Sequence, residues 1–169
     1  MKYSVNPLCF CSWVLLSVCH SIPVLDDKVK NDAKLLVQTT IIRIQKHTSE
    51  LKVSPNIIIS GLDVIPASPP LDGLRSVDET LDIFHLILSK LPMDNVDQIL
   101  ADVFNIQVII KALARSINCE LPESRNTSNL QNFLQNNSMF HITIGNVALD
   151  RLQKYLHKLF INFHELGKC

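Results

Sequence analysis

The chain has 169 residues, with 16 basic and 16 acidic side chains, so its formal net charge is zero. Proteins that bind nucleic acids or anionic membrane surfaces usually carry a clustered excess of positive charge. This composition therefore argues against both partners, and we expect no nucleic-acid binding and no membrane insertion.

Residues 1–21 have the pattern of a secretory signal peptide. Lys2 precedes an apolar run over 8–19, and Cys19-His20-Ser21 resembles a cleavage site. The run is shorter than the roughly 20 apolar residues of a membrane span. A buried N-terminal helix is the alternative interpretation. We expect cleavage before Ile22 and a soluble, secreted single domain over 22–169, whose net charge is about −1 once Lys2 is removed.

Four segments carry apolar residues at intervals of three and four, the pattern of an amphipathic helix. No segment shows the sustained alternation that is typical of strands, so the predicted fold is all-α. Pro92 is expected to end the second helix, and Asp94 to act as the N-cap of the third. The four predicted helices cover 28–46, 74–91, 95–117 and 143–165.

The lengths of the connections predict how these helices are arranged. Pro92-Met93 is a tight link, so the second and third helices should be antiparallel neighbours. The connections 47–73 and 118–142 are each long enough to return the next helix in the same direction. Two long crossovers around one short link predict a four-helix bundle with up-up-down-down topology, the long-chain cytokine arrangement.

The second crossover has two further features. Its stretch 129–140 is compatible with a short extra helix that turns Leu130, Phe133 and Leu134 towards the core. Asn126 and Asn136 each begin an Asn-x-Ser tripeptide and are potential N-glycosylation sites. Such tripeptides also arise by chance, so the occupancy of these two sites is left open.

Removal of residues 1–21 leaves two cysteines, Cys119 and Cys169. In an oxidising compartment they most simply form one disulfide with each other. Closing a loop of this length stabilises the fold by about 4 kcal/mol in the chain-entropy description. Two free thiols are the alternative.

The sequence contains no recognisable catalytic constellation. It has no glycine-rich phosphate or dinucleotide loop, no Gly-x-Ser-x-Gly and no His-Glu-x-x-His. His157 and His164 share a helix face, but they lie seven residues apart, whereas paired metal ligands on a helix usually lie one turn apart. Solvated histidines are the simpler interpretation. We expect no enzymatic activity, no cofactor and no metal site.

Several side chains lie beside the apolar seams of the first and third predicted helices. Scattered exposed apolar residues are normal, but contiguous ones on a secreted bundle indicate a surface for a partner. The residues beside the seams are Asp32, Leu35, Thr39 and Arg43 on the first helix, and Gln98, Asp102, Asn105 and Ile109 on the third, with Phe104 and Val108 also outside its seam.

Six motifs resemble those of the leptin family and occur in the family's order over residues 24–169. The motif GLDVIP is similar to the family signature GLDFIP in the first crossover. Together with the cysteine pair, the six identify the chain as a member of this family. They are KVKNDAKLLVQTTIIRI at 28–44, GLDVIP at 61–66, MDNVDQI at 93–99, SINCELP at 116–122, ALDRLQ at 148–153 and GKC at 167–169.

The resemblance implies a monomeric long-chain cytokine hormone with a role in energy balance and appetite signalling. Its implied partner is a class I cytokine receptor ectodomain, which signals through an associated tyrosine kinase. The family has two receptor-binding surfaces, and the second is needed to activate the receptor. Face one comprises Asp32, Thr39, Arg43, Gln98, Asn105 and Ile109, and face two comprises Leu62, Asp63, Val64, Ile65 and Thr143.

The stretch NIIISGLDVIP at 56–66 is expected to have two roles. Part of 57–59 should pack on the bundle, and 62–65 should present an apolar edge that docks on a receptor sheet, because Val64 and Ile65 are β-branched. The alternative is that the entire stretch packs on the helices.

Departures from the family pattern suggest a receptor face with more apolar contacts. Leu35 and Val108 stand where many leptins have polar residues, Gln38 replaces a basic residue, and Val64 replaces the Phe of the signature.

Two other functions are compatible with a secreted bundle. A carrier would hold an apolar ligand in a pocket lined where the seams are small, at Ala33, Ala114 and Ala148. A receptor antagonist would keep face one and lose face two. The large apolar side chains of the seams favour a filled core over a carrier pocket.

Overall fold

The computed structural model describes residues 22–50, 59–122 and 126–169, and the expected signal peptide lies outside this part of the chain. Helices and turns account for the regular structure of the described residues, with no strand among them, which confirms the all-α prediction. The elements are α2 (Ile22–Glu50), η1 (Leu62–Val64), α3 (Leu74–Lys90), α4 (Asp97–Ser116), α5 (Ser128–Asn136), η2 (Ser138–Phe140), α6 (His141–Asn162) and η3 (Phe163–Glu165).

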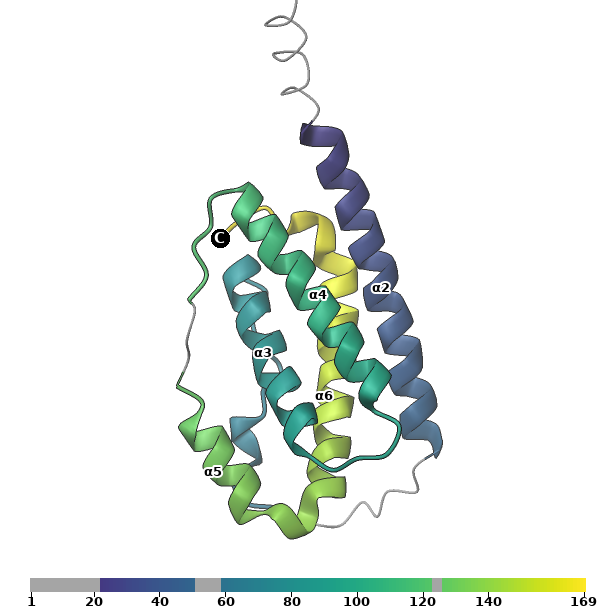
Figure 1. Cartoon of the computed structure of the whole chain (residues 1–169), viewed down its shortest axis with the longest axis vertical. Coiled ribbons are helices and arrows are strands. Elements are labelled where there is room, and N and C mark those ends of the chain that lie inside the picture. The colour runs from purple at the N-terminus through teal and green to yellow at the C-terminus, as the bar shows by residue number, and fades with distance from the viewer. Residues whose placement is uncertain (1–21, 51–58, 123–125) are drawn as a thin grey trace, which may run out of the picture.

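The four long helices form an up-up-down-down bundle. In Figure 1, α2 and α3 run in one direction, and α4 and α6 run in the other. The α3 helix packs against α4, and α2 packs against both α6 and α4. The topology therefore agrees with the one predicted from two long crossovers around one short link.

Tertiary structure moves the helix ends by a few residues. The first helix is longer than predicted at both ends, and α6 begins at His141 and ends at Asn162, followed by one 3₁₀ turn. The α3 helix ends at Lys90, before Pro92, as expected.

The prediction that Asp94 is the N-cap of the third helix is wrong. Val96 occupies the N-cap position and makes no side-chain capping bond. Asn95 adopts a left-handed conformation with φ 59°, which asparagine tolerates better than most residues. The short link therefore turns at Asp94-Asn95 before α4 starts.

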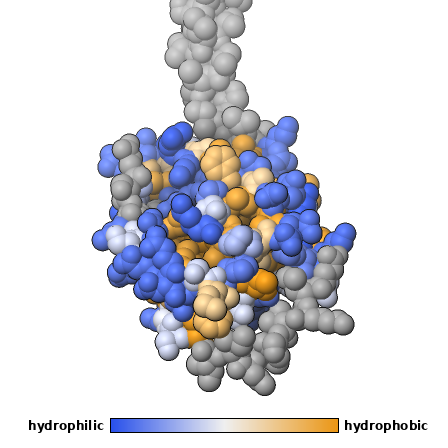
Figure 2. All heavy atoms as spheres, turned by 60° about the horizontal axis from the view of Figure 1, so that its bottom comes forward, coloured by the Kyte–Doolittle hydropathy of each residue, from blue (hydrophilic) through white to orange (hydrophobic). Residues whose placement is uncertain are grey.

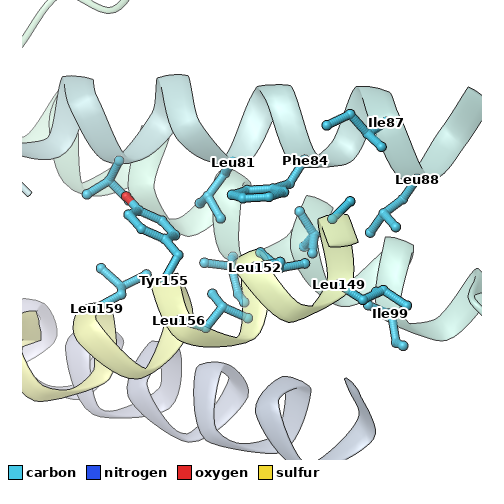
Figure 3. Close-up of a cluster of buried hydrophobic side chains, with 14 of the residues drawn as sticks. Leu81, Phe84, Ile87, Leu88, Ile99, Leu149, Leu152, Tyr155, Leu156 and Leu159 are labelled. Carbon is cyan, nitrogen blue, oxygen red and sulfur yellow. The ribbon is translucent and has the colours of Figure 1, made fainter. Parts of the chain in front are cut away.

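A continuous cluster of buried apolar side chains fills the bundle. The rings of Phe84 and Tyr155 lie 6.3 Å apart between α3 and α6. Burial raises the pKa of the Tyr155 phenol above its ordinary value, because the ionised form is disfavoured away from water. Ala33, Ala114 and Ala148, where a carrier pocket was considered, are fully buried members of this cluster. Figure 3 shows Leu81, Phe84, Ile87 and Leu88 of α3 opposite Leu149, Leu152, Tyr155 and Leu156 of α6.

The extra helix considered for the second crossover exists as α5 and η2. Leu130, Phe133 and Leu134 are buried, as expected for an amphipathic helix that covers one end of the bundle. Gly61 lies against it with φ 87°, and a Cβ atom at Gly61 would lie 3.1 Å from Cδ2 of Phe133. The first crossover therefore contacts α5 through a residue that has no side chain.

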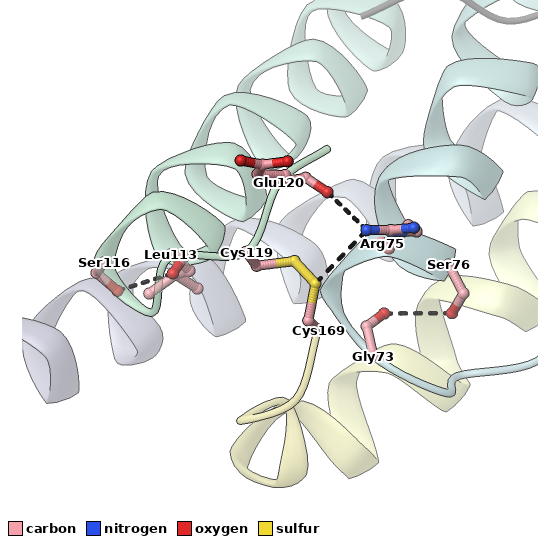
Figure 4. Close-up of a disulfide and its surroundings, with 8 residues drawn as sticks. All are labelled: Gly73, Arg75, Ser76, Leu113, Ser116, Cys119, Glu120 and Cys169. Atoms are coloured by element: carbon pink, nitrogen blue, oxygen red, sulfur yellow. Dashed lines mark hydrogen bonds between the residues drawn. A yellow bond between two sulfur atoms is a disulfide. The ribbon is translucent and has the colours of Figure 1, made fainter. Parts of the chain in front are cut away.

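The predicted disulfide closes the opposite end of the bundle. Cys119 and Cys169 are bonded, with their Cα atoms 5.3 Å apart. The backbone amide of Leu74 donates to the carbonyl oxygen of Lys168 at 3.0 Å, and that of Arg75 donates to Cys169 at 3.2 Å. Figure 4 shows the Arg75 guanidinium beside the disulfide, where it also donates to the Glu120 carbonyl at 2.9 Å. The C-terminal residues thus satisfy first-turn amides of α3 that would otherwise have no partner.

Candidate functional site

Two kinds of feature are not found in the part of the chain that the structure describes: a helix that could span a membrane and a cluster of metal-ligating side chains. Within 22–50, 59–122 and 126–169, no helix is long and apolar enough to cross a membrane. In the same ranges, no three His, Cys, Asp or Glu side chains are grouped in a way that could hold a metal ion. The surfaces predicted from the sequence lie on α2, α4, α6 and the first crossover.

Face one lies on two adjacent helices, α2 and α4. One side of α2 faces the core through buried residues that include Ala33, Val37 and Ile44. This helical register leaves Asp32 exposed, and Thr39 and Arg43 half-buried. On α4, Gln98 and Asn105 are exposed and Ile109 is half-buried. The six residues predicted for face one are thus accessible, on helices that pack against each other.

A buried carboxylate joins the two halves of face one. Asp102 of α4 is 2% exposed and forms an ion pair with the Arg43 guanidinium of α2. Gln98 Nε2 donates to Asp102 Oδ1 at 2.9 Å, and the Thr40 hydroxyl lies 3.4 Å from Asp102 Oδ2. Because a buried carboxylate needs such partners, this cluster fixes the spacing of the two helices and orients two face-one side chains, Arg43 and Gln98.

Sequence reasoning placed Asp102 with the surface residues of its helix and missed this role. The side chain is buried because it points towards α2, where Arg43 and Thr40 replace its water. The spacing Gln98-x-x-x-Asp102 was a signal for a local pair. The partner on α2 depended on the packing of two helices and could not be read from α4 alone.

The crossover part of face two is a tight turn. Residues 62–64 form one turn of 3₁₀ helix after Gly61, and Ile65 N–H donates back to the Leu62 carbonyl at 3.2 Å. Arg151 of α6 donates from Nη1 to the carbonyl oxygens of Leu62 and Ile65. A single guanidinium therefore attaches the turn to α6, a contact that sequence reasoning also missed.

Two expectations for this segment are wrong. Ile65 is fully buried in the core, so its side chain is not part of an exposed apolar edge. The segment 62–64 is helical, so it does not offer an extended strand to a receptor sheet. Asp63 is exposed, and Leu62 and Val64 are half-buried. Ile59 is buried as expected, whereas Ile57 and Ile58 lie outside the described residues.

The remaining face-two residue, Thr143, is half-buried in the first turn of α6. It precedes Arg151 by eight residues, about 12 Å along the helix at 1.5 Å per residue. The hydrogen bonds described between the crossover turn and α6 come from Arg151 and not from Thr143. Face two therefore combines a turn that Arg151 binds with a threonine in the first turn of α6.

Both potential glycosylation residues are exposed at the ends of α5. Asn126 lies just before the helix, where its Oδ1 accepts from the Ser128 amide at 3.0 Å, and Asn136 is the last residue of the helix. Exposed apolar side chains follow α5: Met139 is 90% exposed, and Phe140 and Ile142 are also exposed. Figure 2 views this end of the molecule and shows apolar surface in its middle with hydrophilic side chains around it.

Comparison with known proteins gives one consistent result. The leptin family model matches residues 26–169. The chain is 35% identical to the leptin of Felis catus over 158 residues, which cover 91% of this chain and 92% of that protein. It is 34% identical to the leptin of Mus musculus over 169 residues and 33% identical to that of Rattus norvegicus over 168 residues, each covering 97% of this chain and 98% of the relative.

Proposed function

The chain belongs to the leptin family, and on this basis we propose that it is a secreted, monomeric hormone that binds and activates a class I cytokine receptor. The proposed partner is a receptor ectodomain of the leptin-receptor type. The proposed physiological role is control of energy balance and appetite. The expected signal peptide at 1–21 supports the proposal of secretion.

The observation that carries the proposal is the buried cluster around Asp102. It joins α2 to α4 and holds Arg43 and Gln98 in place on one surface. Both residues belong to the set that the leptin resemblance assigns to receptor binding, and the others of that set lie exposed or half-buried on the same two helices. A surface held by a buried network loses little conformational entropy when it binds, which suits a recognition site.

A binding titration tests the proposal directly. The oxidised protein over 22–169 is titrated against an immobilised leptin-receptor ectodomain, preferably from the same species. Saturable binding at nanomolar to low-micromolar concentration is the expected result. A folded protein with an intact disulfide that does not bind at these concentrations would refute the receptor assignment.

We propose further that face two activates the bound receptor. Its exposed and half-buried members are better targets than the whole 62–65 segment, because truncating the buried Ile65 would damage the core. The triple variant Leu62→Ala, Asp63→Ala, Thr143→Ala is expected to bind receptor with nearly unchanged affinity and to lose signalling in receptor-expressing cells. Unchanged signalling would remove these residues from the activating surface.

We propose that Asn126 and Asn136 carry N-linked glycans, since both are exposed in a protein proposed to be secreted. Protein secreted from animal cells should lose mass on treatment with an amidase that removes N-glycans. Asn126→Gln and Asn136→Gln should each remove one glycan, and a secreted protein of unmodified mass would contradict the assignment.

A further inference from the structure

Four exposed apolar side chains lie next to face one. On α2, Leu35 is 63% exposed and Ile42 is 59% exposed; on α4, Phe104 is 52% exposed and Val108 is 48% exposed. We refer to Leu35 and Ile42 as the α2 apolar pair, and to Phe104 and Val108 as the α4 apolar pair. Apolar area of this kind is unfavourable in water, and when it is concentrated it marks an interaction surface.

Helical register makes both pairs continuous with the polar residues of face one. Thr39 lies four residues after Leu35 and three before Ile42, so it separates the α2 apolar pair on the same face of the helix. On α4, Asn105 lies three residues before Val108, and Phe104 lies four residues before it. The surface thus has polar side chains in its middle and apolar side chains on both sides.

The two apolar pairs are held at a fixed separation. The ion pair between Arg43 and Asp102 ties α2 to α4 between them. The ring of Phe104 also lies 5.9 Å from the ring of His85 on α3, and this contact restricts it on the surface. A partner therefore meets a pre-organised surface, which lowers the entropic cost of binding.

The middle of this surface carries little uncompensated charge. Arg43 is neutralised by Asp102, and Thr39, Gln98 and Asn105 are uncharged. Asp32 is exposed, and it is the one charged residue of face one for which the described contacts show no neutralising pair. A surface of this kind produces a weak field and does not suit a highly charged partner. It suits a protein surface that combines apolar side chains with neutral hydrogen-bonding groups.

We propose that the α2 and α4 apolar pairs carry most of the receptor-binding energy of face one and set its specificity. The inference rests on the proposed function and names the chemistry of the partner: a receptor domain that presents apolar side chains at two places, with neutral polar groups between them. By the leptin resemblance, Leu35 and Val108 are expected to stand where many members of the family have polar residues. A receptor adapted to those polar residues therefore binds this chain more weakly than a receptor with an apolar counterpart.

The test uses two double variants and one matched control. Leu35→Gln with Ile42→Gln, and Phe104→Gln with Val108→Gln, remove each apolar pair while keeping good helix formers at exposed positions. The control is Ile161→Gln, which alters a 72% exposed apolar residue near the end of α6. Circular dichroism, thermal unfolding and light scattering establish that each protein is folded and give its oligomeric state.

Each double variant is expected to bind the same-species receptor ectodomain at least about tenfold more weakly, as for removal of central interface residues. The Ile161→Gln control should bind like the unmodified protein. The affinity of the unmodified protein for the receptor should change little as the salt concentration is raised. If both double variants bind like the unmodified protein, the inference fails and the proposed function stands. If the unmodified folded protein does not bind, the proposed function fails.

A second copy of the chain is the other occupant that the experiment detects. In that case the unmodified protein scatters light as a dimer, the double variants are monomeric, and their receptor affinity is unchanged. This outcome would overturn the assignment of the apolar pairs to the receptor.

Discussion

Face one and face two are built in different ways, although each joins residues that are far apart in the sequence. Face one lies on two long helices that a buried ion pair holds together, so its geometry is part of the bundle. The crossover turn of face two is attached to α6 by hydrogen bonds from Arg151 to two backbone carbonyls. Asp102, which the sequence placed among surface residues, therefore organises face one, and Arg151, which the sequence did not single out, organises the crossover turn of face two.

The difference has a consequence for mutagenesis. In face one, two of the residues proposed to contact the receptor, Arg43 and Gln98, also take part in a stabilising network, so a loss of binding has to be separated from a loss of stability. In face two, Asp63 is exposed and Ile65, two residues later, is buried. The proposed receptor contact and the stabilisation of the core therefore belong to different side chains. Substitutions at Ile65, Arg43, Arg151 and Gly61 separate these contributions, and the expected loss of stability decreases in that order.

Ile65→Ala should give the largest loss of stability. The side chain is fully buried, and truncating a buried isoleucine to alanine costs about 3 kcal/mol because it removes contacts and leaves a cavity. Urea unfolding measures the loss. Asp63→Ala is the matched control, since it changes an exposed residue of the same segment and should alter stability by less than about 0.5 kcal/mol. Equal stability of the two variants would show that the Ile65 side chain does not contribute to the core.

Arg43→Ala should lower the free energy of unfolding by about 2 kcal/mol. The change leaves a buried carboxylate without its cation, and the cost is below the usual range for buried pairs because the Arg43 side chain is 40% exposed. The double variant Arg43→Met with Asp102→Leu should recover most of the stability, since it removes both charges together.

Receptor binding by that double variant distinguishes the two contributions of Arg43. If the guanidinium contacts the receptor, the double variant stays weak in binding although it is stable again. Recovery of both properties would show that Arg43 acts on binding only through the fold.

Arg151→Met should cost about 1.5 kcal/mol, because it removes charge-assisted hydrogen bonds to the carbonyls of Leu62 and Ile65. The effect should be local: amide hydrogen exchange should accelerate at Val64 and Ile65 while the helices remain protected. Signalling should fall more than receptor binding. Lys154→Met is the control, since Lys154 is an exposed cation of the same helix. Unchanged exchange at both amides would contradict the role of Arg151.

Gly61→Ala should have the smallest effect, a loss of about 1 kcal/mol. The backbone at Gly61 has φ 87°, and a Cβ atom there would approach Phe133 to 3.1 Å. Gly167→Ala is the control, because a Cβ atom at Gly167 meets no atom within 4 Å. Thermal unfolding compares the two variants, and equal midpoints would show that the crossover turn adapts without cost.

Much of the fold was determined by the sequence through local periodicity. The apolar spacing identified four helices, and the lengths of three connections were sufficient for their topology, because a short link can only join antiparallel neighbours. The cysteine pair followed from counting the residues left after the signal peptide, and its partners are bonded as predicted. The extra helix was recognisable because Leu130, Phe133 and Leu134 lie on one helical face.

The candidate site was only partly predictable. The six residues of face one were found from their places beside the seams and from the family motifs, and they lie on adjacent helices. Asp102 was assigned to the surface because its local sequence gives no sign of burial, and Ile65 because the leptin resemblance places it in a receptor-binding surface. Each is buried by a segment that is distant in the chain, α2 for Asp102 and the bundle core for Ile65.

The helical segments, their topology and the cysteine pairing could be predicted from the sequence, since these depend on local periodicity, connection length and composition. Tertiary structure alone decided which side chains beside the seams are buried. It also decided which carbonyls Arg151 binds and where α4 begins after Asn95. The physical reason is that burial and long-range hydrogen bonds depend on the neighbours that packing brings into contact, whereas helical periodicity is a property of each segment alone.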